Sequence, residues 1–493
     1  MLKLHHAAVH VSDPAQLITE RDSVERRIRV DRRRPGERSD RAGAEGPEAR
    51  PAAAPPSLFP LPVAPTPPPP APPGATPGQR PQQINNVAQP AQDTGSDLHE
   101  SRRKLRLRLQ EILWKVSMLT SRRGKHPVRD CGRIPRRKGG NVTVMSGPGG
   151  ARFAGFLRCM SVWSCPVCMA TILDGRAREI SRGVGSWIRA GNSAIMGTVT
   201  FPHDAGMDLA PLLDMVADTF RYILADHGWR KLKADLRIAG QIRALELTHG
   251  RHGWHPHLHL LVLIEGEIPQ DALGRLGAFL YDKWNRMVMA QGFRRVDPVK
   301  GIKVEQVQSG QEAGLYIAKV ADGHSLGMEM GRPDLKSGRM KSRTPLEILG
   351  DYANAVAAAE TDGGELPASG KRDIALWHEY EQATQGRQAI TWSKGLHELL
   401  GVTARTDEEL VKAEETGDDE PEPPVAVAVI PDPVRREMVK VPGLRATVLD
   451  AAETNGLDGI NVALALHGIG PALPPPGSGN GLSHWDAFED APF

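Results

Sequence analysis

The residues from Ile242 to Ile264, IRALELTHGRHGWHPHLHLLVLI, constrain the fold more than any other stretch of this 493-residue chain. They contain two apolar segments joined by a glycine-bounded loop, which is the pattern of two paired strands. His255, His257 and His259 are spaced by two, and alternate side chains of a strand point to one face of its sheet. The apolar run LLVLI that follows is typical of a buried strand. Three imidazoles are therefore expected on one face of a strand that enters the core.

The register of this hairpin decides which other groups lie beside the histidines. If the loop spans residues 249 to 254, Glu246 lies opposite His257, and their Cβ atoms are about 5 Å apart. A carboxylate and imidazoles that converge in this way predict a divalent-metal site. We expect His257, His259 and Glu246 as the ligands, with His255 as the alternative to Glu246. A single histidine on a strand is usually structural, but three on one face favour a metal.

All four cysteines fall within one short segment, between Cys131 and Cys168. No apolar run is long enough to span a bilayer, and the N-terminus lacks the apolar core of a signal peptide, so we expect a cytoplasmic protein without a membrane partner. Clustered cysteines in that compartment favour Zn²⁺ over disulfides, with four buried free thiols as the alternative. Four thiolates suit tetrahedral zinc, and one CxxC pair has the usual knuckle spacing. The predicted zinc ligands are Cys131, Cys159, Cys165 and Cys168.

The first part of the chain changes character near residue 98. Residues 1–97 alternate between charged and Pro/Ala-rich segments. Such a sequence cannot bury enough apolar surface to offset the conformational entropy that it would lose on ordering, so we predict disorder. Residues 98–190 combine a basic helix with the cysteine segment. A run of cations is often only a solvated face, but here it is also a candidate phosphate-contact surface. The predicted DNA-binding residues are Arg102, Arg103, Lys104, Arg136, Arg137 and Lys138.

The remaining boundaries follow composition and periodicity. Residues 191–325 alternate strands and amphipathic helices around the histidine hairpin, and we assign them to a core of α+β class with a central antiparallel sheet. We expect residues 326–402 to form a basic, helical accessory subdomain. Residues 403–493 are acidic and then Pro/Gly-rich, and we expect a mostly unstructured tail with a possible small appended element.

The sequence SGQEAGLYIAKVA predicts a helix, and this helix carries a second group of reactive side chains. Glu312, Tyr316 and Lys319 are spaced four and three apart and share one helix face. Of the five tyrosines, only Tyr316 has both a carboxylate and an ammonium at such positions. A phenol is a fit nucleophile for phosphorus, and a cation beside it stabilises charge on the attacked phosphate. Ser309 and Glu312 also form a capping box, so a structural role for Glu312 stays open.

Taken in order, the motifs CGR, WSCPVC, LELTHG, GWHPHLHLLVLI, YIAK, RTPLEIL and WSKGL resemble those of rolling-circle replication initiator (Rep) proteins of bacterial plasmids. These belong to the HUH endonuclease superfamily, and the likeness is to the single-tyrosine type from high-GC Gram-positive plasmids. It covers roughly residues 125 to 400. By this resemblance, His257 and His259 match the HUH metal motif, Tyr316 matches the nicking tyrosine and Lys319 the lysine that follows it. The family fold is an antiparallel sheet flanked by helices.

The resemblance also implies a reaction. A Mg²⁺ or Mn²⁺ ion would polarise the scissile phosphate, and Tyr316 would attack it to leave a 5′-phosphotyrosine link and a free 3′-OH. The substrate would be single-stranded or hairpin origin DNA, with a host helicase and DNA polymerase as partners. Some single-tyrosine relatives use a glutamate at the spacing of Glu312 to activate water. A relaxase or transposase of the same superfamily, or a non-catalytic zinc-containing DNA-binding regulator, are the competing interpretations.

Overall fold

The computed structural model describes residues 95–120, 127–311, 313 and 342–476, and these belong to a unit that is distinct from residues 1–87. Disorder is predicted for residues 1–97, and residues 1–94 of that range lie outside the described part. The same holds for Glu312, Tyr316 and Lys319. None of the described helices is both long enough and apolar enough to cross a membrane.

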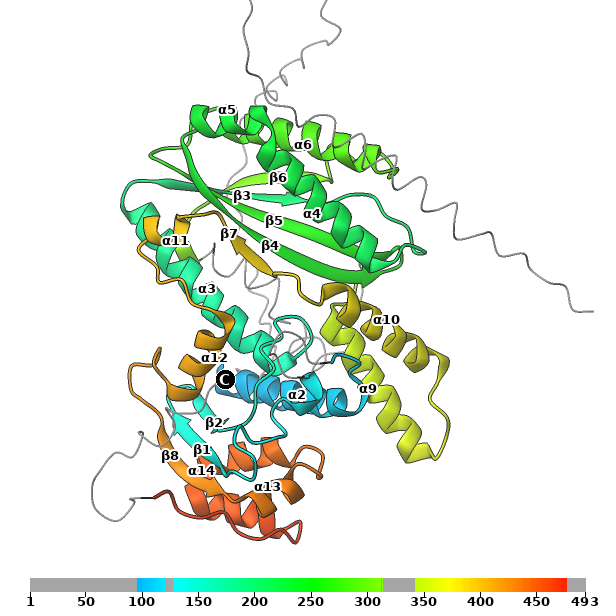
Figure 1. Cartoon of the computed structure of the whole chain (residues 1–493), viewed down its shortest axis with the longest axis vertical. Coiled ribbons are helices and arrows are strands. Elements are labelled where there is room, and N and C mark those ends of the chain that lie inside the picture. The colour runs from blue at the N-terminus through cyan, green and yellow to red at the C-terminus, as the bar shows by residue number, and fades with distance from the viewer. Residues whose placement is uncertain (1–94, 121–126, 312, 314–341, 477–493) are drawn as a thin grey trace, which may run out of the picture. The chain divides into compact units, whose positions relative to one another are not determined.

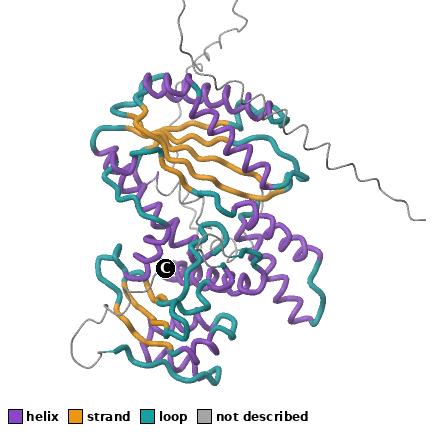
Figure 2. Tube along the Cα trace, viewed as in Figure 1, coloured by secondary structure: helices purple, strands orange, loops and turns teal. Residues whose placement is uncertain are grey.

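A five-stranded sheet forms the centre of the described chain, in the order β6-β3-β5-β4-β7, and every neighbouring pair is antiparallel. The histidine-bearing strand β5 is the middle strand (Figures 1 and 2). This confirms the α+β class and the antiparallel sheet. The strands are β3 (Ser193–Val199), β4 (Ile238–Gly250), β5 (Gly253–Ile264), β6 (Ile302–Val307) and β7 (Ile390–Trp392).

The hairpin of β4 and β5 has the predicted register. Glu246 lies opposite His257, and Thr248 lies opposite His255. The loop is shorter than expected, because pairing continues to Gly250 and Gly253. Gly253 has a φ of 85°, and a Cβ there would lie 3.0 Å from the Cα of Ala205, so the tight turn and its close neighbour both require glycine.

Helices cover both faces of this sheet. Leu258, Leu260 and Val262 of β5 belong to a large apolar core together with residues of α4 (Leu209–Ala225) and α6 (Ala272–Ala290). Leu261 and Leu263 point the other way and pack in a smaller core with α3 (Pro166–Arg189) and α11 (Leu396–Leu399). Because alternate residues share a face, the three histidines lie on the side of α3 and α11. Figure 1 shows α4, α5 (His227–Asp235) and α6 together, away from α3.

The expected accessory region, 326–402, is joined to the sheet. Its helices α9 (Pro345–Asp362) and α10 (Ala368–Thr384) pack on each other, and its strand β7 pairs with β4. Trp254 in the hairpin donates a hydrogen bond to Glu379 of α10 (2.8 Å) and stacks on Tyr380. The hairpin end of the histidine strand is therefore held by α10.

The structure corrects the expectation of a tail over residues 403–493. Through residue 476 this segment is folded, and it includes α12 (Asp407–Thr416), β8 (Val425–Ile430), α13 (Asp432–Met438) and α14 (Leu444–Ala465). Strand β8 completes a second antiparallel sheet, β2-β1-β8, with β1 (Val142–Gly147) and β2 (Gly150–Ala154). This sheet, α13 and α14 enclose their own apolar core.

The acidic segment of this region is not a solvated tail, because some of its carboxylates pair with arginines that are distant in the sequence. Glu415 accepts a hydrogen bond from Arg136 at 2.6 Å, and Glu420 accepts one from Arg152. Both partners lie in or beside the β1–β2 hairpin. Two carboxylates at the acidic end of this region are therefore neutralised by arginines from near the β1–β2 hairpin.

Candidate metal and catalytic sites

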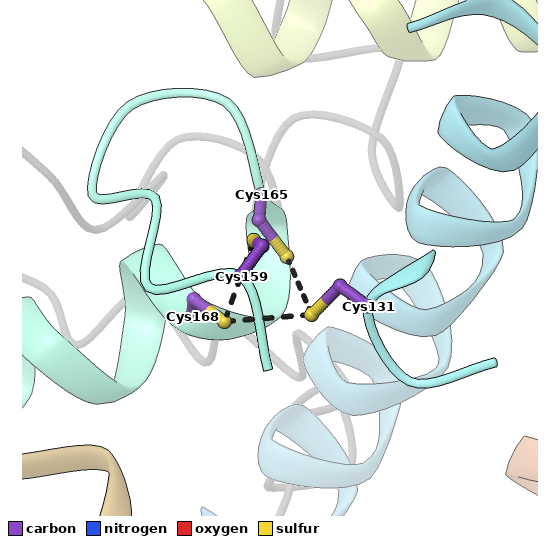
Figure 3. A group of neighbouring side chains, drawn as sticks. All are labelled: Cys131, Cys159, Cys165 and Cys168. Atoms are coloured by element: carbon purple, nitrogen blue, oxygen red, sulfur yellow. Dashed lines mark hydrogen bonds between the residues drawn. The ribbon is translucent and has the colours of Figure 1, made fainter. Parts of the chain in front are cut away.

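The four cysteines converge on one buried point. Their sulfurs lie 3.6 Å apart for Cys131 and Cys168, 3.7 Å for Cys131 and Cys165, and 3.8 Å for Cys159 and Cys168 (Figure 3). Sulfurs at the corners of a regular tetrahedron around Zn²⁺ would be separated by about 3.8 Å, given a Zn–S bond of ~2.3 Å. A disulfide needs ~2.05 Å, so the thiols are unbridged. The cluster thus has the donor set and spacing of a four-thiolate metal site.

Local sequence explains how the ligands are presented. Cys165 is the N-cap residue of α3, Pro166 occupies the first helical position, and Cys168 follows in the first turn. Cys131 comes directly after a 3-10 turn (Val128–Asp130), and Cys159 lies in the segment after β2. The N-terminus of α3 places backbone N–H groups near two of the sulfurs, where a thiolate is favoured over a thiol.

Electrostatics around the cluster favour a charged site. Burial opposes ionisation of Cys165, yet hydrogen bonds from the other three cysteines hold its pKa well below its usual range. Burial raises the pKa of Cys159 well above that range, so the four thiols do not ionise alike without a metal. Burial also disfavours the charge of Arg158, but Cys168 and Glu414 raise the pKa of this guanidinium further above its ordinary value. Arg158 is thus a fixed cation that offsets thiolate charge.

On the histidine face, Glu246 and His259 are directly joined. The Nε2 atom of His259 lies 2.7 Å from a carboxylate oxygen of Glu246, and its Nδ1 lies 3.2 Å from the hydroxyl of Thr198. Burial disfavours the Glu246 carboxylate, but the hydrogen bond with His259 lowers its pKa below the usual value. The Nδ1 atom of His257 is buried and has no hydrogen-bond partner among the described residues. An acceptor or a cation at this position would satisfy it.

These groups are less tightly gathered than the cysteines. Within the described ranges, the four cysteines form the only set of three or more possible ligands whose donor atoms all lie within 4.8 Å of one another. Glu246, His257 and His259 share one face and neighbouring positions, as the register requires, but as a set they do not reach that spacing. His255 is engaged separately, through a hydrogen bond between its Nε2 and Thr200.

His203 belongs to the same face and was not singled out from the sequence. Its ring centroid lies 4.4 Å from that of His255, which lies 4.0 Å from that of His257, so three imidazoles form a column. Burial lowers the pKa of His203, and burial together with His257 lowers the pKa of His255 to about 3. Neutral imidazoles are the form that binds metals. The sequence feature that could have indicated His203 is its position just after β3, the strand that pairs with β5.

The chain that carries the predicted nucleophile leaves and rejoins this same sheet. Ala313 is buried in the apolar core that contains Leu261, two residues beyond His259. After the segment 314–341, which lies outside the described residues, the backbone of Arg343 pairs in both directions with His249 of β4, at 2.8 and 2.7 Å. Both described flanks of the Tyr316 segment are thus fixed to the strands around the histidines.

The six basic residues predicted to bind DNA are placed differently. Arg103 on α2 (Gly95–Val116) pairs with Asp450 and Glu453 of α14, and Lys104 pairs with Asp450 at 3.0 Å. Arg136 pairs with Glu415, as noted above. Arg137 and Lys138 are exposed, and Arg102 is half-buried. Contact with DNA stays a prediction for all six, and three of them also stabilise the fold.

These features define an α+β protein with a buried cluster of four cysteines, spaced as for a metal ion, and a histidine-bearing central strand. The chain belongs to the family of Protein rep from Streptomyces lividans, with which it is 31% identical over 310 residues, covering 53% of this chain and 68% of that protein. It is also similar to a neomycin resistance protein of Streptomyces cyanogenus, 30% identical over 152 residues, covering 26% of this chain and 35% of that protein. No family model and no solved structure matches the chain.

Proposed function

We propose that this protein initiates rolling-circle replication of a plasmid by nicking one strand of origin DNA. Membership of the Rep family supports the replication role. The observation that carries the nicking chemistry is the arrangement on the central strand: Glu246 lies opposite His257 and is hydrogen-bonded to His259. A purely DNA-binding protein has no need of a carboxylate and partly buried imidazoles on one face of its sheet.

The residues of this face fit a divalent cation such as Mg²⁺ or Mn²⁺. A buried nitrogen of His257 has no hydrogen-bond partner among the described residues, and Glu246 supplies a carboxylate whose lowered pKa keeps it ionised. We assign the third position to Glu246 and not to His255, because the Glu246 carboxylate lies beside the two other proposed ligands. When bound, the ion would act as a Lewis acid on the scissile phosphate. The protein's part is to hold His257 and His259 on β5 and Glu246 on the paired strand β4 in fixed positions on one face of the sheet.

Tyr316 is the proposed nucleophile. Its phenolic oxygen attacks the phosphorus, the bond to the 3′ oxygen breaks, and that oxygen takes up a proton to become a free 3′-OH. Tyr316 is three residues from the buried Ala313, a span of at most about 11 Å even when fully extended. Leu261 belongs to the same core as Ala313, and His259 lies two residues before it on β5, a distance of about 6.6 Å. These reaches are compatible with a phenol at the histidine face.

The other proposed roles follow from charge. Lys319 would stabilise the negative charge on the attacked phosphate, and Glu312 would activate water or cap its helix. The exposed Arg137 and Lys138 would contact phosphates of single-stranded or hairpin origin DNA. A host polymerase would extend the free 3′-OH after a host helicase unwinds the duplex, and the reaction would take place in the cytoplasm. The cysteine cluster would hold structural Zn²⁺.

The test is cleavage of a labelled single-stranded origin oligonucleotide, with Mg²⁺ or with EDTA. Wild-type protein, Tyr281→Phe and Tyr352→Phe should cleave it in Mg²⁺ only, and Tyr316→Phe should not cleave it. The cysteine cluster favours a second candidate, a non-catalytic zinc-containing DNA-binding regulator. That candidate predicts origin binding by the wild-type protein without any metal-dependent cleavage.

A further inference from the structure

A glutamine from the N-terminal helix lies against the cysteine cluster. Gln110 of α2 is 1% exposed, and its Nε2 lies 3.3 Å from the sulfur of Cys131 and 3.4 Å from the sulfur of Cys165. A primary amide has two N–H donors, so one side chain can serve both sulfurs at once.

The orientation of this amide is fixed by a buried arginine from the other end of the chain. The Oε1 atom of Gln110 lies 2.8 Å from Nη1 of Arg445 in α14. A guanidinium only donates hydrogen bonds, so the contacting atom of Gln110 must be its oxygen. Arg445 therefore excludes the flipped amide and directs the N–H groups of Gln110 towards the sulfurs.

Arg445 is itself held by several groups around the cluster. It is 1% exposed, donates to the backbone oxygens of Gly132 and Leu107 at 3.1 Å each, and pairs with Glu111 at 3.1 Å. Its guanidinium also lies 4.4 Å from the centroid of the Trp114 ring. Gly132 is the residue after the ligand Cys131, so α14 is tied to both the ligand loop and α2.

The packing leaves no room to rearrange this connection. Gly132 has a φ of 64°, and a Cβ there would lie 2.6 Å from Oε1 of Gln110. A larger residue would push the amide away from Arg445 and from the sulfurs. The glycine after Cys131 thus permits both the turn and the close approach of Gln110.

We propose that Gln110 and Arg445 are positioning residues of the cysteine metal site, and that metal occupancy and docking of the C-terminal helix α14 depend on each other. Amide donors stabilise sulfurs that carry negative charge, as metal-bound thiolates do, and outer partners of this kind fix the orientation of ligands. Arg445 and the side chain of Arg158 are buried beside a site that keeps a net negative charge when four thiolates bind a divalent ion. Without a metal, nothing holds the four sulfurs at this spacing, so Gln110 and, through it, Arg445 lose fixed partners and α14 should loosen.

The first test compares metal retention in variants of the full-length chain loaded with Zn²⁺. Gln110→Glu keeps the shape of the side chain and an acceptor for Arg445, but removes both donors to sulfur. Release of zinc to a chromogenic chelator should be at least about tenfold faster than in the wild type. Arg445→Lys should act in the same direction. The matched control is Arg152→Lys, a buried arginine of β2 that pairs with Glu420 and, among the described residues, has no hydrogen bond or ion pair with Gln110 or a cysteine.

Two further measurements separate positioning from general stability. Loaded with Co²⁺, Gln110→Glu should shift the sulfur-to-cobalt charge-transfer band to lower energy, because the thiolates lose hydrogen bonds. In the wild-type protein, removal of metal should increase amide hydrogen exchange across residues 444–465, while β5 keeps its protection. The proposal would be overturned by zinc release at the wild-type rate in Gln110→Glu, by zinc release in Arg152→Lys as fast as in Gln110→Glu, by an unshifted band, or by unchanged exchange in α14.

Discussion

Replacement of Glu246 by Gln is the substitution whose effect can be worked out most completely. It keeps the volume of the side chain and a hydrogen-bonding group 2.7 Å from His259, but it removes the charge. A hydrogen bond to a charged group contributes about 1.5–3 kcal/mol and a neutral one about 0.5–1.5 kcal/mol. The Glu246 side chain is 30% exposed, so the lower end applies, and we expect a loss of about 1 kcal/mol in the free energy of unfolding without metal.

The effect of metal on stability then separates structure from function. A ligand that binds only the folded state stabilises it by about 2.7 kcal/mol at one hundred times its Kd. Urea unfolding of the zinc-loaded protein with and without Mn²⁺ should show this gain in the wild type and in Glu265→Gln, an exposed carboxylate at the far end of β5. Glu246→Gln should lose most of the gain. Equal stabilisation of Glu246→Gln and wild type by Mn²⁺ would refute Glu246 as a ligand.

Three other predictions concern the two metal sites, product release and pH. Cys165→Ser should lower the zinc content and reduce the free energy of unfolding by several kcal/mol, whereas His257→Ala should fold, keep its zinc and fail to nick; equal zinc content in both would contradict this. Glu312→Gln should spare cleavage but let covalent protein–DNA product accumulate; normal release would leave only a capping role, worth about 1 kcal/mol. The folded protein lowers the pKa of His255 to about 3, so below about pH 6.5 the unfolded chain binds more protons than the folded protein. The free energy of unfolding of the metal-free protein should therefore fall from pH 7 to pH 5. Urea unfolding should show a smaller fall in His255→Gln.

The hairpin register could be predicted because it depends on neighbouring residues only. One short loop joins β4 and β5, and the length of that loop sets which residues pair, so Glu246 lies opposite His257. The pairing of β3 with β5 links residues about 60 positions apart, and nothing local specifies it. His203 was missed for that reason, although it lies four residues after the end of the strand that pairs with the histidine strand.

The fold of the C-terminal region could not be predicted from composition. Strand β8 pairs with β1, whose residues lie nearly 300 positions earlier, and the carboxylates that made the region look like a solvated tail are paired with Arg136 and Arg152. Gln110 gave no signal either, because a glutamine in a basic helix is ordinary. Its role depends on Arg445, which only the folded chain brings beside it.

The most direct test of the central claim is to map the covalent bond between protein and DNA. The full-length protein is incubated with Mg²⁺ and a single-stranded origin oligonucleotide, both partners are digested, and the peptide that carries a nucleotide is sequenced by mass spectrometry. The proposed mechanism predicts one adduct, a 5′-phosphate ester on Tyr316, formed only with the divalent ion. An adduct on Tyr281 or Tyr352, or cleaved DNA without any protein adduct, would contradict it.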